Sequence, residues 1–214
     1  MTGGTDWRAW HAGYDDPDSD LSRRRRSVQR QVEAWLDTRD DAALQVVSAC
    51  AGNGLDLLEV LARRPADAGR VRARLLELDD GLADDAERYA AAHDLTAVDV
   101  RRTDAGRTDS YAGAVPADLM MMCGVFGNVT DDDLRGTVAL LPQLCAPGAT
   151  VLWTRGRFDS GDLTPTIRGW FAESGFAEVA MDVPKYTGYR VGAHRLVAAA
   201  RPLEAGRTFF TFTR

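Results

Sequence analysis

The chain of 214 residues is long enough for one domain with its own core, and its formal net charge of −6 argues against a protein that binds duplex nucleic acid through a basic face. Its three cysteines are odd in number and lack CxxC spacing, which excludes a full disulfide framework and favours a reducing compartment. The chain starts without the apolar core of a signal peptide, and no apolar run approaches the ~20 residues of a membrane span, so we expect a cytoplasmic protein that does not bind membranes.

The first part of the chain, residues 1–40, is expected to form an arm followed by a helix. Residues 1–20 are rich in Gly, Asp and aromatic side chains and predict a partly ordered arm. Apolar residues at helical spacing then indicate a helix from Leu21 to Asp37. The four consecutive arginines at 23–26 fit either a solvated basic face or a helix in which one or two of them contact an anionic group.

In the second part, residues 41–214, short apolar runs alternate with helical patterns. This alternation indicates βαβ units and therefore an α/β domain with a doubly wound, mostly parallel sheet. The last strands have short connections, which favour an antiparallel hairpin at one edge. The expected strands are 44–50, 71–78, 96–103, 117–123, 149–154, 176–182, 189–200 and 208–213, and the expected helices are 55–64, 82–93, 131–141 and 164–174.

Ligands of such sheets bind beyond the carboxyl ends of the strands, near the point where the strand order reverses. The loops at 50–55, 77–80, 104–111, 123–130 and 154–163 are therefore the candidate sites. In the first of them, Gly52-Asn53-Gly54 allows a sharp turn and lets a ligand lie against the backbone. This turn alone fits several cofactors.

Acids at the next two strand ends suit a nucleoside. Glu77 lies about 20 residues beyond Gly54, where an acid holds the ribose in dinucleotide-binding folds. A carboxylate accepts from two vicinal hydroxyls at once, although the acidic stretch that follows Glu77 also fits a solvated side chain. Asp104 can accept from the amine of adenine or form a turn. Together the two acids predict a ligand that contains adenosine.

A nicotinamide dinucleotide, used by an oxidoreductase, is the first alternative. A GxGxxG fingerprint that starts at Gly52 requires Gly or Ala at the position of Leu57, and one that starts at Cys50 lacks its first glycine. The Gly-Lys-Ser/Thr of a P-loop is also absent from the sequence. A different ligand that contains adenosine fits these residues better than a nicotinamide dinucleotide or a P-loop nucleotide does.

Six segments, in order, resemble the motifs of class I S-adenosylmethionine-dependent methyltransferases. They are Val46-Val-Ser-Ala-Cys-Ala-Gly-Asn-Gly, Leu76-Glu-Leu-Asp-Asp-Gly-Leu-Ala-Asp-Asp-Ala, Asp104-Ala, Pro116-Ala-Asp-Leu-Met-Met-Met-Cys-Gly-Val-Phe-Gly-Asn, Leu144-Cys-Ala-Pro-Gly-Ala-Thr-Val-Leu-Trp and Trp170-Phe-Ala-Glu-Ser-Gly-Phe. The resemblance spans residues 44–212. It implies a small member of this family, with a seven-stranded Rossmann-like methyltransferase fold and an antiparallel edge strand. It also implies S-adenosylmethionine as methyl donor and S-adenosylhomocysteine as product.

The resemblance also implies roles for the residues that match its motifs. Ala49, Cys50, Ala51, Gly52 and Gly54 would border the methionine and ribose, Glu77 would hold the ribose hydroxyls, Leu78 would pack on the adenine, Asp104 and Ala105 would contact the adenine edge, and Cys123 and Gly124 would face the methionine. Two positions depart from the motif, because Ser48 stands where the family often has an acid and Cys50 where it has its first glycine.

The acceptor is expected to be a small molecule, O- or N-methylated by direct in-line transfer, because the loop after the fourth strand lacks the Asn/Asp-Pro-Pro-aromatic motif of base-amino methyltransferases. Phe126 and Asn128 are candidates to contact this acceptor, and Arg155 is a candidate to bind a carboxylate. The family often folds an N-terminal segment over the pocket as a lid. In residues 1–40, this adds Trp10 as an acceptor contact, and His11 and Tyr14 as catalytic candidates.

Other possibilities remain open at this point. The chain could bind the cofactor for a regulatory role or a reaction other than methyl transfer. Cys50 and Cys123 are expected to be packed side chains, with a nucleophilic or redox pair as the alternative, and no metal is expected. The segment 208–213 fits an inner strand or the edge of a homodimer.

Overall fold

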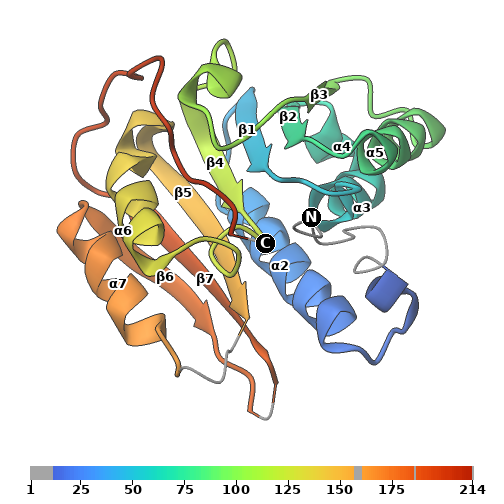
Figure 1. Cartoon of the computed structure of the whole chain (residues 1–214). Coiled ribbons are helices and arrows are strands. Elements are labelled where there is room, and N and C mark those ends of the chain that lie inside the picture. Colours follow the sequence, from blue (N-terminus) through green and yellow to red (C-terminus); the bar gives the residue numbers. More distant parts are fainter. Residues whose placement is uncertain (1–11, 157–160, 186, 214) are drawn as a thin grey trace.

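The computed structural model describes residues 12–156, 161–185 and 187–213, and its central feature is one seven-stranded sheet (Figure 1). The strands lie in the order β3-β2-β1-β4-β5-β7-β6, and all neighbours are parallel except those of β7, which is antiparallel to both β5 and the edge strand β6. This confirms the doubly wound, mostly parallel sheet with antiparallel pairing at one edge. The strands are β1 (Leu44–Ala49), β2 (Val71–Glu77), β3 (Val98–Arg102), β4 (Ala117–Met122), β5 (Cys145–Gly156), β6 (Phe176–Asp182) and β7 (Tyr189–Leu196).

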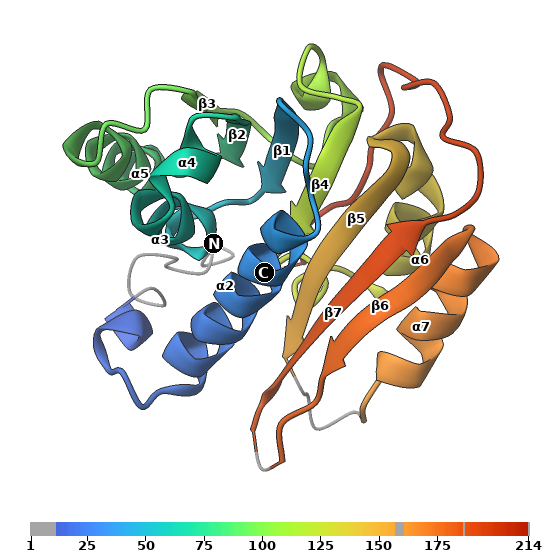
Figure 2. The same cartoon turned by 180° about the vertical axis from the view of Figure 1, so that it is seen from behind.

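Helices cover both faces of the sheet (Figures 1 and 2). Buried residues of α2, α3 and α5 form one apolar cluster on the first face, and those of α6 and α7 form the other. The helices are α2 (Asp20–Asp37), α3 (Leu55–Arg63), α4 (Pro65–Ala68), α5 (Asp80–Ala92), α6 (Asp131–Leu140) and α7 (Thr164–Glu173), with 3-10 turns η1 (Ala12–Asp15), η2 (Thr108–Tyr111) and η3 (Leu141–Gln143). No helix in the described ranges is both long and apolar enough to cross a bilayer.

The central strands are apolar on both sides because helices cover both sides. Along β1, Val46 belongs to the cluster of α2 and α3, whereas the next residue, Val47, belongs to the cluster of α6 and α7. Leu119 and Met120 divide in the same way on β4. This burial explains why β1 and β4 read as continuous apolar runs instead of alternating patterns.

Polar side chains fix the starts of three helices. Ser19 accepts from the backbone N of Ser22 at 3.0 Å at the start of α2. Asp79 accepts from the backbone N of Leu82 at 2.9 Å and caps α5, and Thr130 caps α6 in the same way. Such caps satisfy backbone donors that have no partner inside the helix. The cap at Asp79 also holds the loop that follows β2 in place.

The N-terminal helix is packed into the domain. Val28, Val32 and Leu36 of α2 are buried in the same cluster as α3, and α2 also contacts β7. The helix begins at Asp20, one residue before the expected start, and ends at the expected Asp37. The arm residues 1–11 lie outside the described ranges, so the prediction of a lid stays a prediction.

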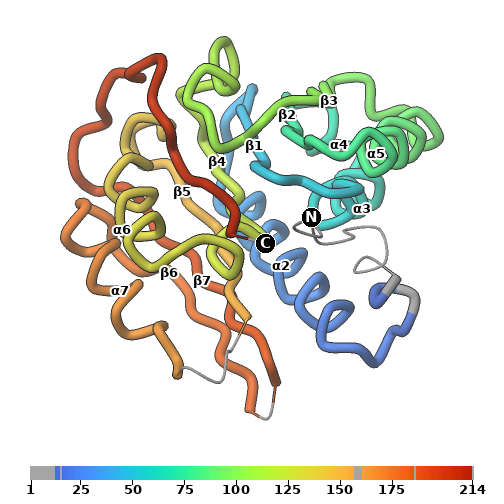
Figure 3. The backbone as a smooth tube through the Cα atoms, in the orientation of Figure 1, coloured from blue at the N-terminus to red at the C-terminus, as the bar shows by residue number. Residues whose placement is uncertain are grey.

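The segment 208–213 was expected to be a strand, and the structure contradicts this. It has only an isolated antiparallel bridge, between Thr208 and Arg107, in the described residues. Its other backbone partners are scattered, because Phe209 N donates to Gly106 O at 2.6 Å and Thr213 N donates to Asn128 O at 2.8 Å. The alternation of Thr and Phe therefore reflects a segment with one apolar face that runs past the loops after β3 and β4 to the centre of the view without joining the sheet (Figure 3).

Some element bounds also differ from expectation. The strand β5 begins at Cys145, earlier than the expected 149, and β7 ends at Leu196 instead of 200. The one-turn helix α4 was not expected, and Pro65 begins it, where the missing N–H of proline is not needed.

The strand order reverses between β1 and β4. From β1 the chain continues outward through β2 to β3, and from β4 it continues on the opposite side to β5. The crevice predicted for such sheets therefore lies above the carboxyl ends of β1 and β4. The turn after β1 and the loop after β4 meet at this point.

We predict that Gly54→Ala destabilises the protein, because Gly54 has φ +71° and an added Cβ would lie 2.5 Å from Leu75 Cδ2. The backbone penalty is about 1–2 kcal/mol, and overpacking adds about 1–3 kcal/mol. Gly136→Ala is the matched control, since Gly136 lies in α6 with open space around it, and it should raise stability by about 0.5–1 kcal/mol. Urea denaturation measures both, and equal stability of Gly54→Ala and wild type would contradict the left-handed turn.

Candidate functional site

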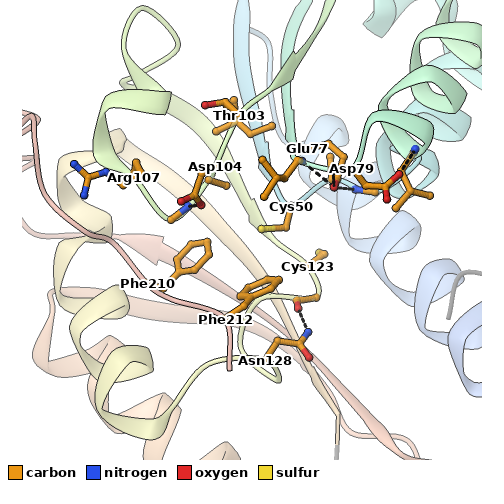
Figure 4. A pocket seen from close by; sticks show the side chains of 18 of the residues that line it. Cys50, Glu77, Asp79, Thr103, Asp104, Arg107, Cys123, Asn128, Phe210 and Phe212 are labelled. Atoms are coloured by element: carbon orange, nitrogen blue, oxygen red, sulfur yellow. Dashed lines mark hydrogen bonds between the residues drawn. The ribbon is translucent and has the colours of Figure 1, made fainter. Parts of the chain in front are cut away.

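A cavity of about 640 Å³ lies above the carboxyl ends of the strands (Figure 4). Its walls come from the turn after β1, the loops after β2, β3 and β4, helices α2 and α3, and the segment 208–212. Among the residues expected to bind a cofactor, those that line the cavity are Cys50, Ala51, Gly52, Glu77, Leu78, Asp104, Ala105, Cys123 and Gly124. The structure thus brings the expected strand-end residues together around one space.

Ala49 and Gly54 were also expected at the ligand, but neither lines the cavity. Ala49 is fully buried in the core as the last residue of β1. Gly54 precedes α3 in the left-handed conformation and packs against Leu75 and Leu58. Both positions shape the turn from inside the protein, and they do not contact the space above it.

Three residues of the turn after β1 have the left-handed backbone conformation: Cys50 (φ 51°), Gly52 (φ 58°) and Gly54 (φ 71°). Glycine adopts this conformation freely, whereas a residue with a Cβ does so at a cost of about 1–2 kcal/mol. This geometry explains why a glycine is the usual residue at the position of Cys50 in the motif that the turn resembles. Cys50 keeps the same backbone shape and adds a thiol to the cavity wall.

Glu77 is the most densely bonded side chain of the site. Its Oε2 accepts from Gly52 N at 2.7 Å, and its Oε1 accepts from Leu78 N at 2.9 Å and Asp79 N at 2.8 Å. The carboxylate therefore joins the turn after β1 to the loop after β2. A carboxylate has about four lone-pair directions, so after these three bonds it can still accept from a ligand hydroxyl.

The loop after β3 presents a second carboxylate to the cavity. Asp104 Oδ1 accepts from Gly106 N at 2.8 Å, and Oδ2 has no hydrogen-bond partner within the described ranges. Tyr111 holds this loop from below by donating to Ala105 O at 2.8 Å. Across the cavity wall, Leu78 is 69% exposed, which is unusual for a large apolar side chain. A free acceptor and an uncovered apolar side chain together suit a flat heterocycle with an amino group.

A charged cluster lies on another part of the wall. Arg24 of α2 is buried, donates to the hydroxyl of Tyr14 and lies 5.8 Å from the centroid of that ring. Asp56 of α3 lines the same region. Among the arginines at 23–26, Arg24 lines the cavity, where it can contact an anionic group, one of the two possibilities from the sequence.

Burial changes the ionisation of this cluster. It raises the pKa of Tyr14 to about 12, against the opposing charge of Arg24. It also raises the pKa of Asp56, which Arg24 and Arg25 partly oppose. Tyr14 is therefore a protonated phenol at neutral pH, and its oxygen accepts from a cation.

Only one of the four expected acceptor contacts is placed on the cavity by the structure. Asn128 lines it and donates from Nδ2 to Gly124 O at 2.6 Å. Phe126 is fully buried in the core, where it stacks on Trp153 with centroids 5.5 Å apart. Arg155 does not line the cavity, and it donates to Phe126 O at 2.5 Å and to Asp131 at 3.2 Å. Phe126 and Arg155 thus support the loop after β4, and Trp10 lies outside the described residues, as does the catalytic candidate His11.

Several cavity residues were missed by sequence reasoning. They include Asp56, Arg107, Thr208, Phe210, Thr211 and Phe212. The spacing of Thr208, Phe210 and Phe212 did signal a shared face, but the pattern is the same for a strand. No local signal marked Asp56, because its position depends on how α3 packs beside α2.

The three cysteines are free thiols in the described chain. Burial raises the pKa of Cys50, and the carboxylates of Glu77 and Asp104 raise it further. Burial also raises the pKa of Cys123 and Cys145. Because the thiolate is the reactive form, these environments disfavour a nucleophilic or redox pair. Within the described ranges, no group of three or more His, Cys, Asp or Glu side chains is arranged to hold a metal.

Comparison with known proteins gives the fold type. No protein-family model and no curated protein matches the sequence. Among solved structures, an O-methyltransferase family protein from Burkholderia thailandensis matches with a TM-score of 0.64 and 20% identity over 92% of this chain, which spans 61% of that protein. The magnesium protoporphyrin IX methyltransferase of Synechocystis PCC 6803, solved with bound SAM, matches with a TM-score of 0.65 and 15% identity, covering 90% of this chain and 91% of that one.

This chain has the Rossmann-like methyltransferase fold. A DszA carbon methyltransferase adds a third match, with a TM-score of 0.64 and 14% identity over 84% of this chain and 55% of that one. The expected seven-stranded methyltransferase fold is thereby confirmed. The cavity lies where this fold type is expected to bind its ligand, above the reversal of strand order.

We predict slow alkylation of the cavity thiols in the native protein. The raised pKa of Cys50 and Cys123 keeps the thiolate fraction low at pH 8, so iodoacetamide should modify both more than about tenfold more slowly than a free thiol. Mass spectrometry of digested protein measures each site, with the urea-unfolded chain as the control for full reactivity. Rapid alkylation of native Cys50 at pH 8 would show that the thiol is activated and would contradict this assignment.

Proposed function

We propose that the protein is an S-adenosylmethionine-dependent methyltransferase that methylates a small-molecule acceptor at oxygen or nitrogen. The observation that carries the proposal is the placement of charge around one cavity. The carboxylates of Glu77 and Asp104 line the cavity at the carboxyl ends of β2 and β3, whereas Arg24 and Asp56 line it from α2 and α3. S-adenosylmethionine has a matching distribution, with a ribose diol and adenine amine in one half and an amino acid in the other.

The residues present fit each part of this cofactor. Glu77 has capacity for a ribose hydroxyl after its three backbone bonds, and Asp104 Oδ2 is positioned to accept from the adenine amine. Leu78 offers its exposed side chain to the adenine ring. The buried guanidinium of Arg24 suits the carboxylate of the methionine, because an arginine binds a carboxylate with directed charge-assisted hydrogen bonds.

The cofactor supplies a methyl group that is already activated on a sulfonium. The protein therefore has to hold the acceptor in line with the S–CH₃ bond, and positioning of this kind accounts for roughly 7–11 kcal/mol of a barrier. A general base is needed only when the acceptor atom starts protonated. With a pKa of about 12, Tyr14 is suited to orient Arg24 and is unsuited to take a proton at neutral pH. We retain His11 as the candidate base.

A small acceptor is favoured by the cavity and by charge. The cavity of about 640 Å³ leaves limited room beside a nucleoside cofactor. The net charge of −6 disfavours a polyanionic nucleic acid. The free thiols fit a reducing compartment such as the cytoplasm.

We predict that S-adenosylhomocysteine binds the wild-type protein at micromolar strength and that Glu77→Ala weakens binding more than about tenfold, since the ribose contact and the anchored turn are lost together. Asp104→Ala should weaken binding less, because the side chain of Asp104 holds only Gly106 within the described chain. Asp85→Ala is the control, because Asp85 lies on α5 outside the cavity lining. Isothermal titration calorimetry measures each affinity, and urea denaturation checks that each variant is folded.

The outcomes separate the candidate functions. Absence of heat with the wild type, or equal affinity in wild type and Glu77→Ala, would refute the proposal. Tight binding without methyl consumption over a broad acceptor panel would favour a regulatory or other cofactor-binding role. Thermal stabilisation by NAD(H) instead of S-adenosylhomocysteine would favour an oxidoreductase.

A further inference from the structure

Four carboxylates line the cavity within the described ranges, those of Asp56, Glu77, Asp79 and Asp104. Glu77 and Asp79 stand where β2 ends, and Asp104 follows β3. Asp56 instead lies in the first turn of α3. A further wall of the cavity comes from residues 207–213, which we call the strap. Asp56 is thus the one carboxylate of the four that lies within a helix.

The side chain of Asp56 has no hydrogen-bond donor of its own in the described residues. Each of the other three carboxylates accepts from at least one backbone N–H group. Asp56 lies in the first turn of α3, but it makes no capping hydrogen bond there. Because it is also partly buried, it has lost water without gaining a donor in exchange, and such an exchange costs free energy. A ligand with a positive charge and N–H groups would therefore be stabilised here.

The surroundings of Asp56 carry the opposite charge. Arg24 lines the same cavity from α2, the helix that packs against α3. Burial raises the pKa of Asp56, and the charges of Arg24 and Arg25 oppose this rise, although Asp56 forms no ion pair with Arg24. An acid and a base that line one cavity without pairing with each other match a ligand that has both charges, such as the zwitterion of an amino acid.

The turn after β1 lacks a charge that the motif it resembles usually has. Ser48, at the position where an acid is common, is 6% exposed and does not line the cavity. It is enclosed in the sheet, with Leu75 of β2 on one side and Met121 of β4 on the other. Asp56 supplies a carboxylate to the cavity from the helix that follows the same turn.

Interaction with the helix dipole alone does not account for this arrangement. An acid in the first turn of a helix is stabilised by the partial positive charge of the helix N-terminus. Asp132, the second residue of α6 as Asp56 is of α3, meets this condition on the exposed surface. Asp56 meets it while lining a cavity, where its charge is also available to a ligand.

We propose that Asp56 binds the α-ammonium group of S-adenosylmethionine, and that this contact makes the site select a cofactor with its amino acid half complete. The inference rests on the proposed methyltransferase function and adds a specificity-determining residue to it. An ammonium group has three N–H donors and a positive charge, so it provides what the carboxylate of Asp56 lacks. Adenosine, which has no amino acid, forgoes this contact.

The test compares S-adenosylhomocysteine with an analogue that lacks only its amino group, by calorimetry on the full chain. Asp56→Asn keeps the size of the side chain, and it should weaken binding of S-adenosylhomocysteine about tenfold or more, as expected for the loss of a charge-assisted hydrogen bond. The deaminated analogue should bind the wild type about tenfold more weakly than S-adenosylhomocysteine does. Its affinities for wild type and Asp56→Asn should agree within about twofold, because the partner of the carboxylate is then missing in both.

Asp132→Asn is the matched control. It makes the same change at the same position of α6, outside the cavity lining, and should leave both affinities unchanged. Urea denaturation shows that each variant is folded.

The outcomes separate this inference from the proposed function. If the wild type does not bind S-adenosylhomocysteine, both fail. If it binds, but Asp56→Asn binds equally well, this inference alone fails. The same holds, without any variant, if the wild type binds the deaminated analogue as tightly as S-adenosylhomocysteine. An equal loss of both ligands in Asp56→Asn would show that Asp56 only supports the cavity wall, and would also overturn the inference.

Discussion

The site depends on the hydrogen bonds by which the Glu77 carboxylate gathers three backbone N–H groups. These donors belong to Gly52, Leu78 and Asp79, so one side chain fixes the turn after β1 against the loop after β2. Hydrogen bonds of this kind, from peptide N–H groups to an ionised carboxylate, are stronger than those between neutral groups. Asp79 in turn caps α5. The parallel pairing of β1 with β2 brings Glu77 within reach of the turn. The pairing that builds the sheet therefore also builds the site.

The loop after β4 is held in a comparable way, by hydrogen bonds from β5 and from the segment 207–213 and by ring packing against β5 and α7. Gly124 N donates to Thr154 Oγ1 of β5 at 2.9 Å, and Arg155 donates to Phe126 O. From the other side, Thr213 of the strap donates to Asn128 O. Behind the loop, Phe126, Trp153 and Phe171 pack as a layer of aromatic rings in the core. A loop supported from three sides presents a preorganised wall, which reduces the entropy lost when a ligand binds.

The sequence predicted the sheet and the strand-end residues well because both follow from local rules. Continuous apolar runs such as 44–49 have to be buried on both faces, and parallel strands bring their carboxyl-end loops together. Glu77 and Asp104 could be assigned from that rule alone. Phe126 could not be placed, because neighbouring residues of a loop point in different directions and only the packing against Trp153 turns this ring into the core. The strap was misjudged for a related reason, since alternation of Thr and Phe specifies one apolar face but does not specify the partner that covers it.

The position of the strap has a consequence for biosynthesis. Residues 207–213 are translated long after the turn at 50–54 and the loop after β2, yet they complete the wall that faces those loops. Residues 207–213 follow β7 in the chain, and until they dock Phe209 has no place against Tyr111 and the cavity is open on one side. A nascent chain therefore carries the turn and its anchoring carboxylate early, and gains an enclosed cavity only when its last described residues dock.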